Sequence, residues 1–136
     1  MRYLILVKAT ESSTPAGPEA LAAMARFKEQ AIKAGVLLAA EGLQPGETGA
    51  CIEKSGGQTL VTDGPCNDTR ESVEGFWIIK AGNRAQALTW AMRVPLAEGD
   101  RLEVRRITEL SDFAGNRVSA AALAREQAWR DGLQNP

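Results

Sequence analysis

Residues 75–80 read GFWIIK, and this stretch decides the fold together with two others of the same kind. Residues 3–7 read YLILV, and residues 36–40 read VLLAA. Each is a short apolar run bounded by polar or turn-forming residues, which is typical of a strand. None of the three alternates between apolar and polar residues, so we expect both faces of their sheet to be covered.

Two segments predict helices, one between the first two of these strands in chain order and one after the third. The first is predicted over residues 18–34, because Pro18 suits the first helical position and Gly35 suits the position after the last. The second is predicted over residues 83–94, where Asn83 is a favourable N-cap. Each helix follows a strand and precedes another, so each can cross over the sheet.

The remaining segments complete the order of elements. Residues 50–54 and 58–62 flank Ser55-Gly56-Gly57, which predicts a hairpin, and residues 63–74 form a polar stretch that predicts a loop. Residues 101–107 alternate as a last strand. The order β-α-β-hairpin-β-α-β predicts an α+β protein, a ferredoxin-like split βαβ fold with an extra β-hairpin strand.

The chain is predicted to hold one domain over residues 1–113 and a C-terminal helical extension over residues 114–136. Within the extension, an alanine-rich and charged stretch predicts a helix that ends at Gly132. One side of that helix, shared by Val118, Ala122, Arg125 and Trp129, is weakly apolar. It either docks through Trp129 or remains a mobile tail.

The composition excludes several classes of protein. The chain has 136 residues, a formal charge of −1, 44% hydrophobic residues and no histidine. A strongly basic nucleic-acid binder and a disordered chain are therefore excluded, and no apolar run approaches a membrane span. Without histidine, a Ser-His-Asp or Cys-His site and a histidine zinc site are excluded within one chain. We expect a cytoplasmic protein without metal or cofactor, and without nucleic-acid or membrane partners.

The two cysteines, Cys51 and Cys66, do not form a CxxC pair. We expect both to be reduced, as in a cytosolic protein. Cys66 has no histidine to activate it and stands among carboxylates, so a packing role is favoured over a nucleophilic one.

The apolar strands predict a homodimer through the sheet face. Two helices can cover one face of the sheet, and the other face is larger than the apolar patch that a monomer usually exposes. A twofold pair of sheets packed face to face would cover it. In the alternative, the C-terminal helix folds over this face.

Four segments carry a family resemblance: AGVLLAAEGLQP at residues 34–45, TLVTDGPCNDTRESVEGFWII at 59–79, ALTWAMRVP at 87–95 and LEVRRITEL at 102–110. Together they resemble the YCII-related proteins of the DGPF type, over about residues 1–113. The resemblance implies a dimeric α/β barrel of ferredoxin-like protomers. It implies no particular reaction, because most members of the family have none assigned.

The chain departs from the family pattern at two points. The aromatic residue that usually ends the DGPF block is replaced by Cys66, although Thr69 and Glu71 of the following block are retained. The wider family has a histidine and an aspartate proposed as an active-site pair. Since this chain lacks histidine, that mechanism does not transfer.

Two carboxylates are the candidate catalytic residues. Asp63 ends a strand and opens a Gly-Pro turn, so it is either a turn cap or a general acid or base at the mouth of a cleft. Glu41 follows five apolar residues. It is therefore either partly buried beside Asp63, away from water, or an exposed residue at the end of a strand.

The candidate substrate-binding residues are Arg70, Glu71, Gly64 and Pro65, all in the polar stretch after Asp63. Arg70 could hold a carboxylate or phosphate, or it could form an ordinary surface ion pair. Gly64 and Pro65 would make the turn rigid.

These observations suggest an uncharacterised small-molecule protein. One hypothesis is a cofactor-independent enzyme of the lyase or isomerase type that uses Asp63 and Glu41 in a cleft near the DGP turn. The alternatives are a ligand-binding module without turnover, or a regulatory homodimer that meets a protein partner through residues 116–136. The sequence leaves open whether the protein is an enzyme.

Overall fold

The computed structural model describes residues 1–66, 71–113 and 119–134. The chain divides into two compact units, Met1–Arg106 and Ile107–Pro136, and each is described by itself. The predicted loop residues 67–70 and the start of the predicted C-terminal helix, residues 116–118, lie outside the described residues.

The first unit is built on a four-stranded antiparallel sheet. Its strands are β1 (Arg2–Thr10), β2 (Leu37–Gly42), β5 (Glu71–Lys80) and β6 (Arg101–Arg106), in the spatial order β2-β5-β1-β6. Each of the two crossovers therefore joins strands that have another strand between them, which is the split βαβ arrangement. The predicted ferredoxin-like fold is confirmed.

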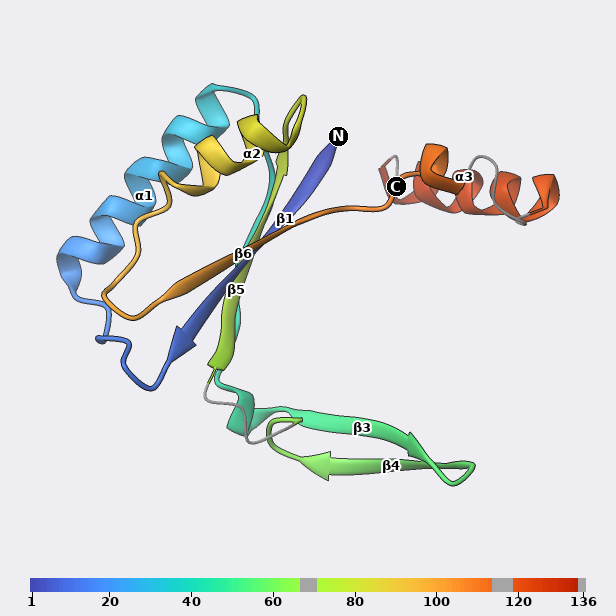
Figure 1. The fold of residues 1–136 in the computed structure, drawn as a ribbon, viewed down its shortest axis with the longest axis horizontal. Coiled ribbons are helices and arrows are strands. Elements are labelled where there is room, and N and C mark those ends of the chain that lie inside the picture. The colour runs from blue at the N-terminus through green and yellow to red at the C-terminus, as the bar shows by residue number, and fades with distance from the viewer. Residues whose placement is uncertain (67–70, 114–118, 135–136) are drawn as a thin grey trace. The chain divides into compact units, whose positions relative to one another are not determined.

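Two helices lie on the same side of this sheet, α1 (Pro18–Lys33) and α2 (Arg84–Ala91) (Figure 1). The predicted ends of α1 and the predicted start of α2 are confirmed by local geometry, whereas α2 ends at Ala91, three residues before the predicted Val94. Pro18 is the first residue of α1, and Gly35 adopts φ +71° just beyond it. The side chain of Asn83 accepts a hydrogen bond from the backbone N–H of Gln86, which caps α2.

The core lies between the helices and the sheet. Ile5 and Ile79 are completely buried at its centre. Phe27 of α1 meets Trp77 of β5 edge to face, with 5.1 Å between ring centroids. Trp77 is therefore a core residue, as predicted, and Trp90 packs half-buried beside it.

The opposite face of the sheet explains why the strands do not alternate. Cross-strand pairing places Leu4 opposite Ile78 and Leu6 opposite Phe76, on the face that α1 and α2 leave free. These four side chains are only half-buried. The sheet of this unit thus has one apolar face under its helices and a second apolar patch on the helix-free face.

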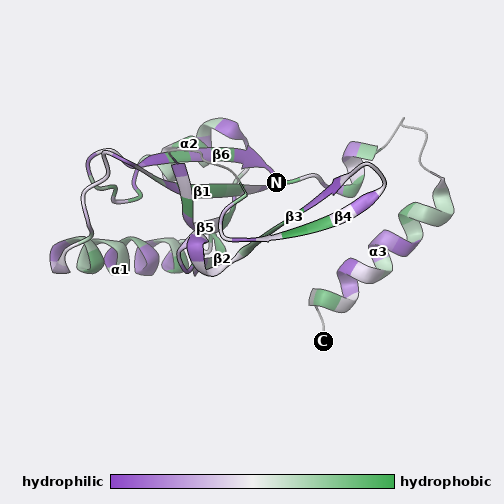
Figure 2. Ribbon diagram, turned by 90° about the horizontal axis from the view of Figure 1, so that it is seen from below, coloured by the Kyte–Doolittle hydropathy of each residue, from purple (hydrophilic) through white to green (hydrophobic). Residues whose placement is uncertain are grey.

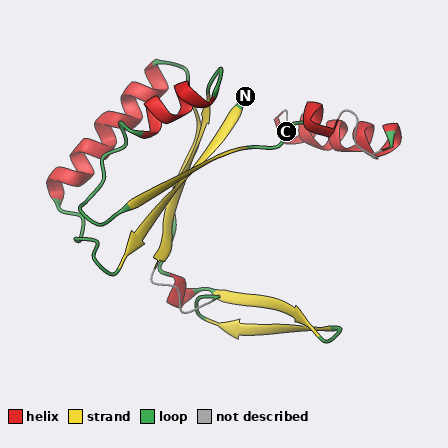
Figure 3. Cartoon of the chain, in the orientation of Figure 1, coloured by secondary structure: helices red, strands yellow, loops and turns green. Residues whose placement is uncertain are grey.

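The predicted hairpin is confirmed, but it does not extend the main sheet. Strands β3 (Ala50–Ser55) and β4 (Gln58–Asp63) pair with each other and form a second sheet of two strands (Figure 3). A short 3-10 turn, η1 (Gly46–Thr48), precedes them. The hairpin exposes apolar side chains, and Figure 2 shows a hydrophobic stretch along β4.

The predicted loop over residues 63–74 is wrong at its C-terminal end. Strand β5 begins at Glu71, because residues 71–73 pair with Lys8–Thr10 of β1 after a bulge between Val7 and Lys8. Residues 71–74 read ESVE with one apolar residue, Val73, so no local pattern marks them as a strand. The long-range pairing with β1 holds them extended.

The expectation of two reduced cysteines is also wrong. The structure joins Cys51 to Cys66 in a disulfide, with 4.6 Å between the two Cα atoms. The hairpin brings them together, because β3 pairs Ala50 with Asp63 and the chain then turns back at Gly64. Cys51 is buried and Cys66 is exposed.

Loss of this disulfide is expected to loosen the hairpin and leave the main sheet intact. The bond spans 15 residues of sequence, which corresponds to about 3 kcal/mol in the chain-entropy account. A lone two-stranded hairpin is only marginally stable without such a link. We expect faster amide hydrogen exchange in β3 and β4 of Cys66→Ser, and in the wild type after reduction. Equal acceleration in β1 and β5 would contradict this local effect.

The second unit contains η2 (Leu110–Phe113) and α3 (Ala120–Gln134). Arg130 of α3 pairs with Glu126 one turn earlier and with Glu109 before η2, which ties the helix to its preceding segment. The predicted helix stop at Gly132 is wrong, because α3 continues through it without a left-handed turn. Among the described helices of both units, none is long and apolar enough to cross a membrane.

Candidate functional site

A cleft of about 480 Å³ opens between α1 and the sheet, at the edge formed by β2. Its lining residues come from β1, α1, β2 and β5: Val7, Leu21, Met24, Lys28, Ala40, Glu41, Gly42, Glu74, Gly75, Phe76 and Trp77. The volume lies within the range of small-molecule sites, and most of the lining is apolar, as in such sites.

A pair of glycines makes this part of the sheet hollow. Gly42 of β2 lies directly opposite Gly75 of β5, and Val7 of β1 is the next residue in the same cross-strand row. The two glycines place no side chain between the sheet and α1. A Cβ at Gly75 would lie only 2.8 Å from the carbonyl oxygen of Glu41, so the two strands also approach closely there.

Three charged residues line the cleft among these apolar walls: Lys28, Glu41 and Glu74. Both glutamates are exposed, and one carboxylate oxygen of Glu74 accepts a hydrogen bond from the Ser72 hydroxyl. The cleft can therefore hold an apolar body and meet a polar or charged end with a carboxylate.

Of the two predicted catalytic carboxylates, Glu41 is a lining residue of this cleft and Asp63 is not. Glu41 pairs with Phe76 in the row of Leu6, so it borders the cleft from the helix-free side of the edge strand β2. Asp63 ends β4 on the separate two-stranded sheet, opposite Ala50, and is exposed. The structure thus does not gather both carboxylates around the cleft.

The Gly-Pro turn after Asp63 closes the base of the hairpin. Gly64 is buried at φ +94°, a conformation that favours glycine, and its N–H donates to the carbonyl oxygen of Gly49 at 2.8 Å. Pro65 is exposed and lies against Gly46. Both residues form the turn at the base of the hairpin, and neither lines the cleft.

Glu71 belongs to an ion-pair network on the helix-free face of the sheet. Its carboxylate pairs with Arg101 and lies 3.8 Å from the Lys8 ammonium. Lys8 also contacts Glu103 at 2.9 Å, and its hydrogen bond and positive charge lower the pKa of Glu103 below the usual glutamate value. Arg70, the other predicted ligand-binding charge, lies outside the described residues.

Sequence reasoning missed the features that create the cleft, which are the glycine pair and the residues of α1 above it. The glycines carry a weak signal, because Gly42 ends one apolar strand and Gly75 begins another. Only the register shows that they are opposite each other. Over the described part of the chain, no group of three or more histidine, cysteine, aspartate or glutamate side chains could hold a metal ion.

The family of the chain follows from comparison with known proteins. The family model of the YCII-related domain matches residues 1–111. The chain belongs to the YCII-related family. A bacterial relative of this YCII-related protein, an uncharacterized protein of Rhizobium meliloti (strain 1021), is 29% identical over 96 residues, which cover 67% of this chain and 77% of the relative. The match to the family model includes every strand of both sheets and both helices of the first unit.

Proposed function

We propose that this YCII-related protein binds a small molecule with an apolar body and a polar end in the cleft between α1 and the sheet. The observation that carries the proposal is the Gly42–Gly75 pair, which leaves the covered face of the sheet bare beneath Leu21 and Met24. Burial of an apolar ligand on this floor supplies the driving force, and the charges at the cleft orient its polar end.

Glu41 is the group best suited to chemistry on such a ligand. It borders the cleft at the edge strand β2, where its carboxylate can accept a proton from a polarised carbon and the carboxylic acid that results can return it without any cofactor. The proposed reaction class is therefore a cofactor-independent proton transfer, of the isomerase or lyase type. The alternative is binding without turnover, in which Glu41 only fixes the orientation of the ligand.

Filling the cleft tests the proposal. A library of small metabolites is screened for those that raise the melting temperature of the wild type. Gly42→Leu is expected to abolish these shifts, because a Cβ at Gly42 meets no atom closer than 4.0 Å and the rest of the side chain would occupy the cleft that Gly42 lines. Ala22→Leu, on an exposed position of α1 outside the cleft, is the matched control and is expected to keep them.

Product analysis on the ligands found then separates catalysis from binding. We expect Glu41→Gln to keep ligand binding and lose turnover if Glu41 transfers a proton. Asp63→Asn provides the comparison, and loss of turnover there would show that the hairpin carries part of the site. If a ligand raises the melting temperature of Gly42→Leu as much as that of the wild type, binding in this cleft is refuted.

We further propose that the helix-free face of the sheet pairs with the same face of a second copy. Leu4, Leu6, Phe76 and Ile78 form its apolar patch, and charges of both signs surround the patch. Lys8 and Arg101 lie at one end of it, whereas Glu41 lies on the edge strand β2 in the row of Leu6. A twofold partner can cover the apolar centre and match these charges in one arrangement.

A further inference from the structure

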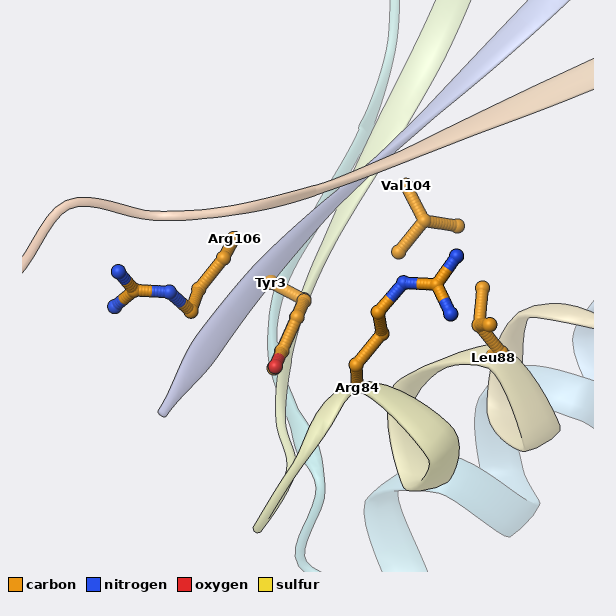
Figure 4. Close-up of a pocket in the computed structure, with 5 residues that line it drawn as sticks. All are labelled: Tyr3, Arg84, Leu88, Val104 and Arg106. Atoms are coloured by element: carbon orange, nitrogen blue, oxygen red, sulfur yellow. The ribbon is translucent and has the colours of Figure 1, made fainter.

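The two sheets of the first unit differ in how their open edges are protected. An open edge strand can pair with another strand, and proteins prevent this with charges, bulges or prolines. In the main sheet, the edge strand β6 reads RLEVRR, and Figure 4 shows two arginines at this edge, Arg106 of the strand itself and Arg84 of α2. The other edge strand, β2, has a register shift between Leu37 and Ala39. Both edges of the main sheet therefore have a protective feature.

In the two-stranded sheet of the hairpin, only one strand has such a feature. Strand β3 reads ACIEKS and carries the charged residues Glu53 and Lys54. Strand β4 reads QTLVTD, and its residues 59–62 include three β-branched side chains and no charge, glycine or proline. All six residues of β4 are exposed, and among the described strands it pairs with β3 alone (Figure 3). The outer edge of β4 is thus open, and its composition favours pairing with another strand.

The hydrogen-bond pattern of the hairpin determines which backbone groups of β4 point to this outer edge. In an antiparallel pair, every second residue bonds the neighbouring strand, and the residues between direct their N–H and C=O groups to the other side. The two-residue turn at residues 56–57 makes Ser55 and Gln58 a bonded pair. At the other end of β4, the Gly64 N–H donates to the Gly49 carbonyl oxygen at 2.8 Å, in the same alternation. The residues of β4 whose backbone groups point outward are therefore Thr59, Val61 and Asp63.

These outward groups are complementary to the same groups of a second copy. When Val61 lies opposite Val61 of another chain about a twofold axis, Thr59 lies opposite Asp63 on both sides of the axis, and each of these pairs exchanges both of its backbone hydrogen bonds. Since Ile52 is the cross-strand neighbour of Val61, this register also forms one apolar row across both hairpins. No two like charges lie opposite each other, because each aspartate meets a threonine.

The charged strand β3 would end this association at two copies. After β4 of each copy has paired, β3 is the outer strand on both sides of a four-stranded sheet, and Glu53 and Lys54 protect it from further addition. Four strands also give the hairpin the size at which a sheet becomes independently stable. A second copy of this chain therefore fits the edge better than an open-ended series of strands.

We propose that the outer edge of β4 is an interaction surface at which two copies of this chain join their hairpins into one antiparallel sheet. It belongs to the two-stranded sheet, so it is distinct from the helix-free face of the main sheet and does not depend on the proposed small-molecule cleft. One strand pair makes a small interface, and we therefore expect a weak association, with a dissociation constant above about 100 μM.

Cysteine cross-linking of the full chain tests the proposed register. In Val61→Cys, the introduced thiols of two copies would lie opposite each other with about 5.5 Å between Cα atoms, which a disulfide can span. Ile52→Cys is the matched control, because Ile52 shares the face of Val61 and is 67% exposed against 66%. Both β4 strands would separate it from its copy, which places the thiols about 14 Å apart. We expect oxidation at high protein concentration to join Val61→Cys at least about tenfold faster than Ile52→Cys. Peptide mass spectrometry identifies the bond between the introduced cysteines.

A pair of charge variants measures the strength of the association. Val61→Lys would place two ammonium groups opposite each other, so we expect it to weaken the association about tenfold or more. Ile52→Lys adds the same charge on β3 and is expected to weaken it less than about threefold, since that position meets no like charge of the other copy. Both are measured by sedimentation equilibrium in the Leu6→Glu background, which removes pairing through the helix-free face, and thermal melts check that each variant folds.

Three outcomes would overturn the proposal. Equal cross-linking of Val61→Cys and Ile52→Cys would show that the hairpins meet without the proposed register. Equal weakening by the two lysines would show that β4 is not the strand that pairs. A Val61→Cys chain that stays unlinked at high concentration would exclude a second copy as the partner of this edge.

Discussion

Gly75→Ala is expected to lower the free energy of unfolding by about 1–3 kcal/mol, the usual cost of forcing an extra group into a packed site. The new Cβ would lie 2.8 Å from the Glu41 carbonyl oxygen and 3.3 Å from the Gly42 Cα atom. Both are backbone atoms, so the strand β2 itself must move to relieve the contact. Because β2 is an edge strand, we expect its pairing with β5 to weaken first.

The residue directly opposite provides the control for this prediction. Gly42→Ala adds the same methyl group to the same cross-strand pair, yet its Cβ meets only the Glu74 carbonyl oxygen at 4.0 Å. We expect its stability to stay within about 0.5 kcal/mol of the wild type or to rise slightly, since alanine restricts the unfolded chain. Urea denaturation of both variants measures the difference. Equal stabilities would show that β2 and β5 do not approach as closely as the structure indicates.

The two substitutions also connect the fold to the proposed site. The close approach of β2 and β5 and the bare floor of the cleft come from the same two glycines. A displaced β2 would move Glu41 as well as the cleft wall. Gly75→Ala is therefore expected to lose ligand binding together with stability, whereas Gly42→Leu loses binding with the strand in place.

The elements that could be predicted from the sequence are those with local causes. Pro18 and Asn83 act at the helix ends where they stand, and the two glycines of the hairpin turn, Gly56 and Gly57, both adopt positive φ. Apolar strands without alternation indicated a sheet with two apolar faces, and the helix-free patch agrees. In each case the physical reason lies within a few residues of sequence.

The features that the sequence did not predict depend on which distant segments of the chain pair with each other. The start of β5 at Glu71 requires pairing with Thr10, and the disulfide requires the register that aligns Ala50 with Asp63. The same limit applies to the site. Glu41 was found because it follows an apolar strand, but the sequence could not show that Asp63 belongs to a separate sheet. Lys28 of α1 was missed because only the tertiary structure places it among the residues that line the cleft.

Leu6→Glu is expected to convert the proposed homodimer into a monomer, with a loss of at least about 3 kcal/mol, or roughly 100-fold in the dissociation constant. Leu6 lies in the apolar patch of the helix-free face, so the new carboxylate would be buried against the partner. It would also stand in the same cross-strand row as Glu41 and Glu103, which adds repulsion between like charges.

Light scattering coupled to size exclusion measures this effect, and a thermal melt checks that the variant still folds. Ala22→Glu adds the same charge to an exposed position of α1 and is expected to leave the dimer unchanged. If the wild type itself is a monomer at micromolar concentration, the second copy is ruled out as the cover of this face. The apolar patch would then favour the alternative in which the chain's own C-terminal segment lies over the sheet, because a monomer rarely leaves so large an apolar surface in water.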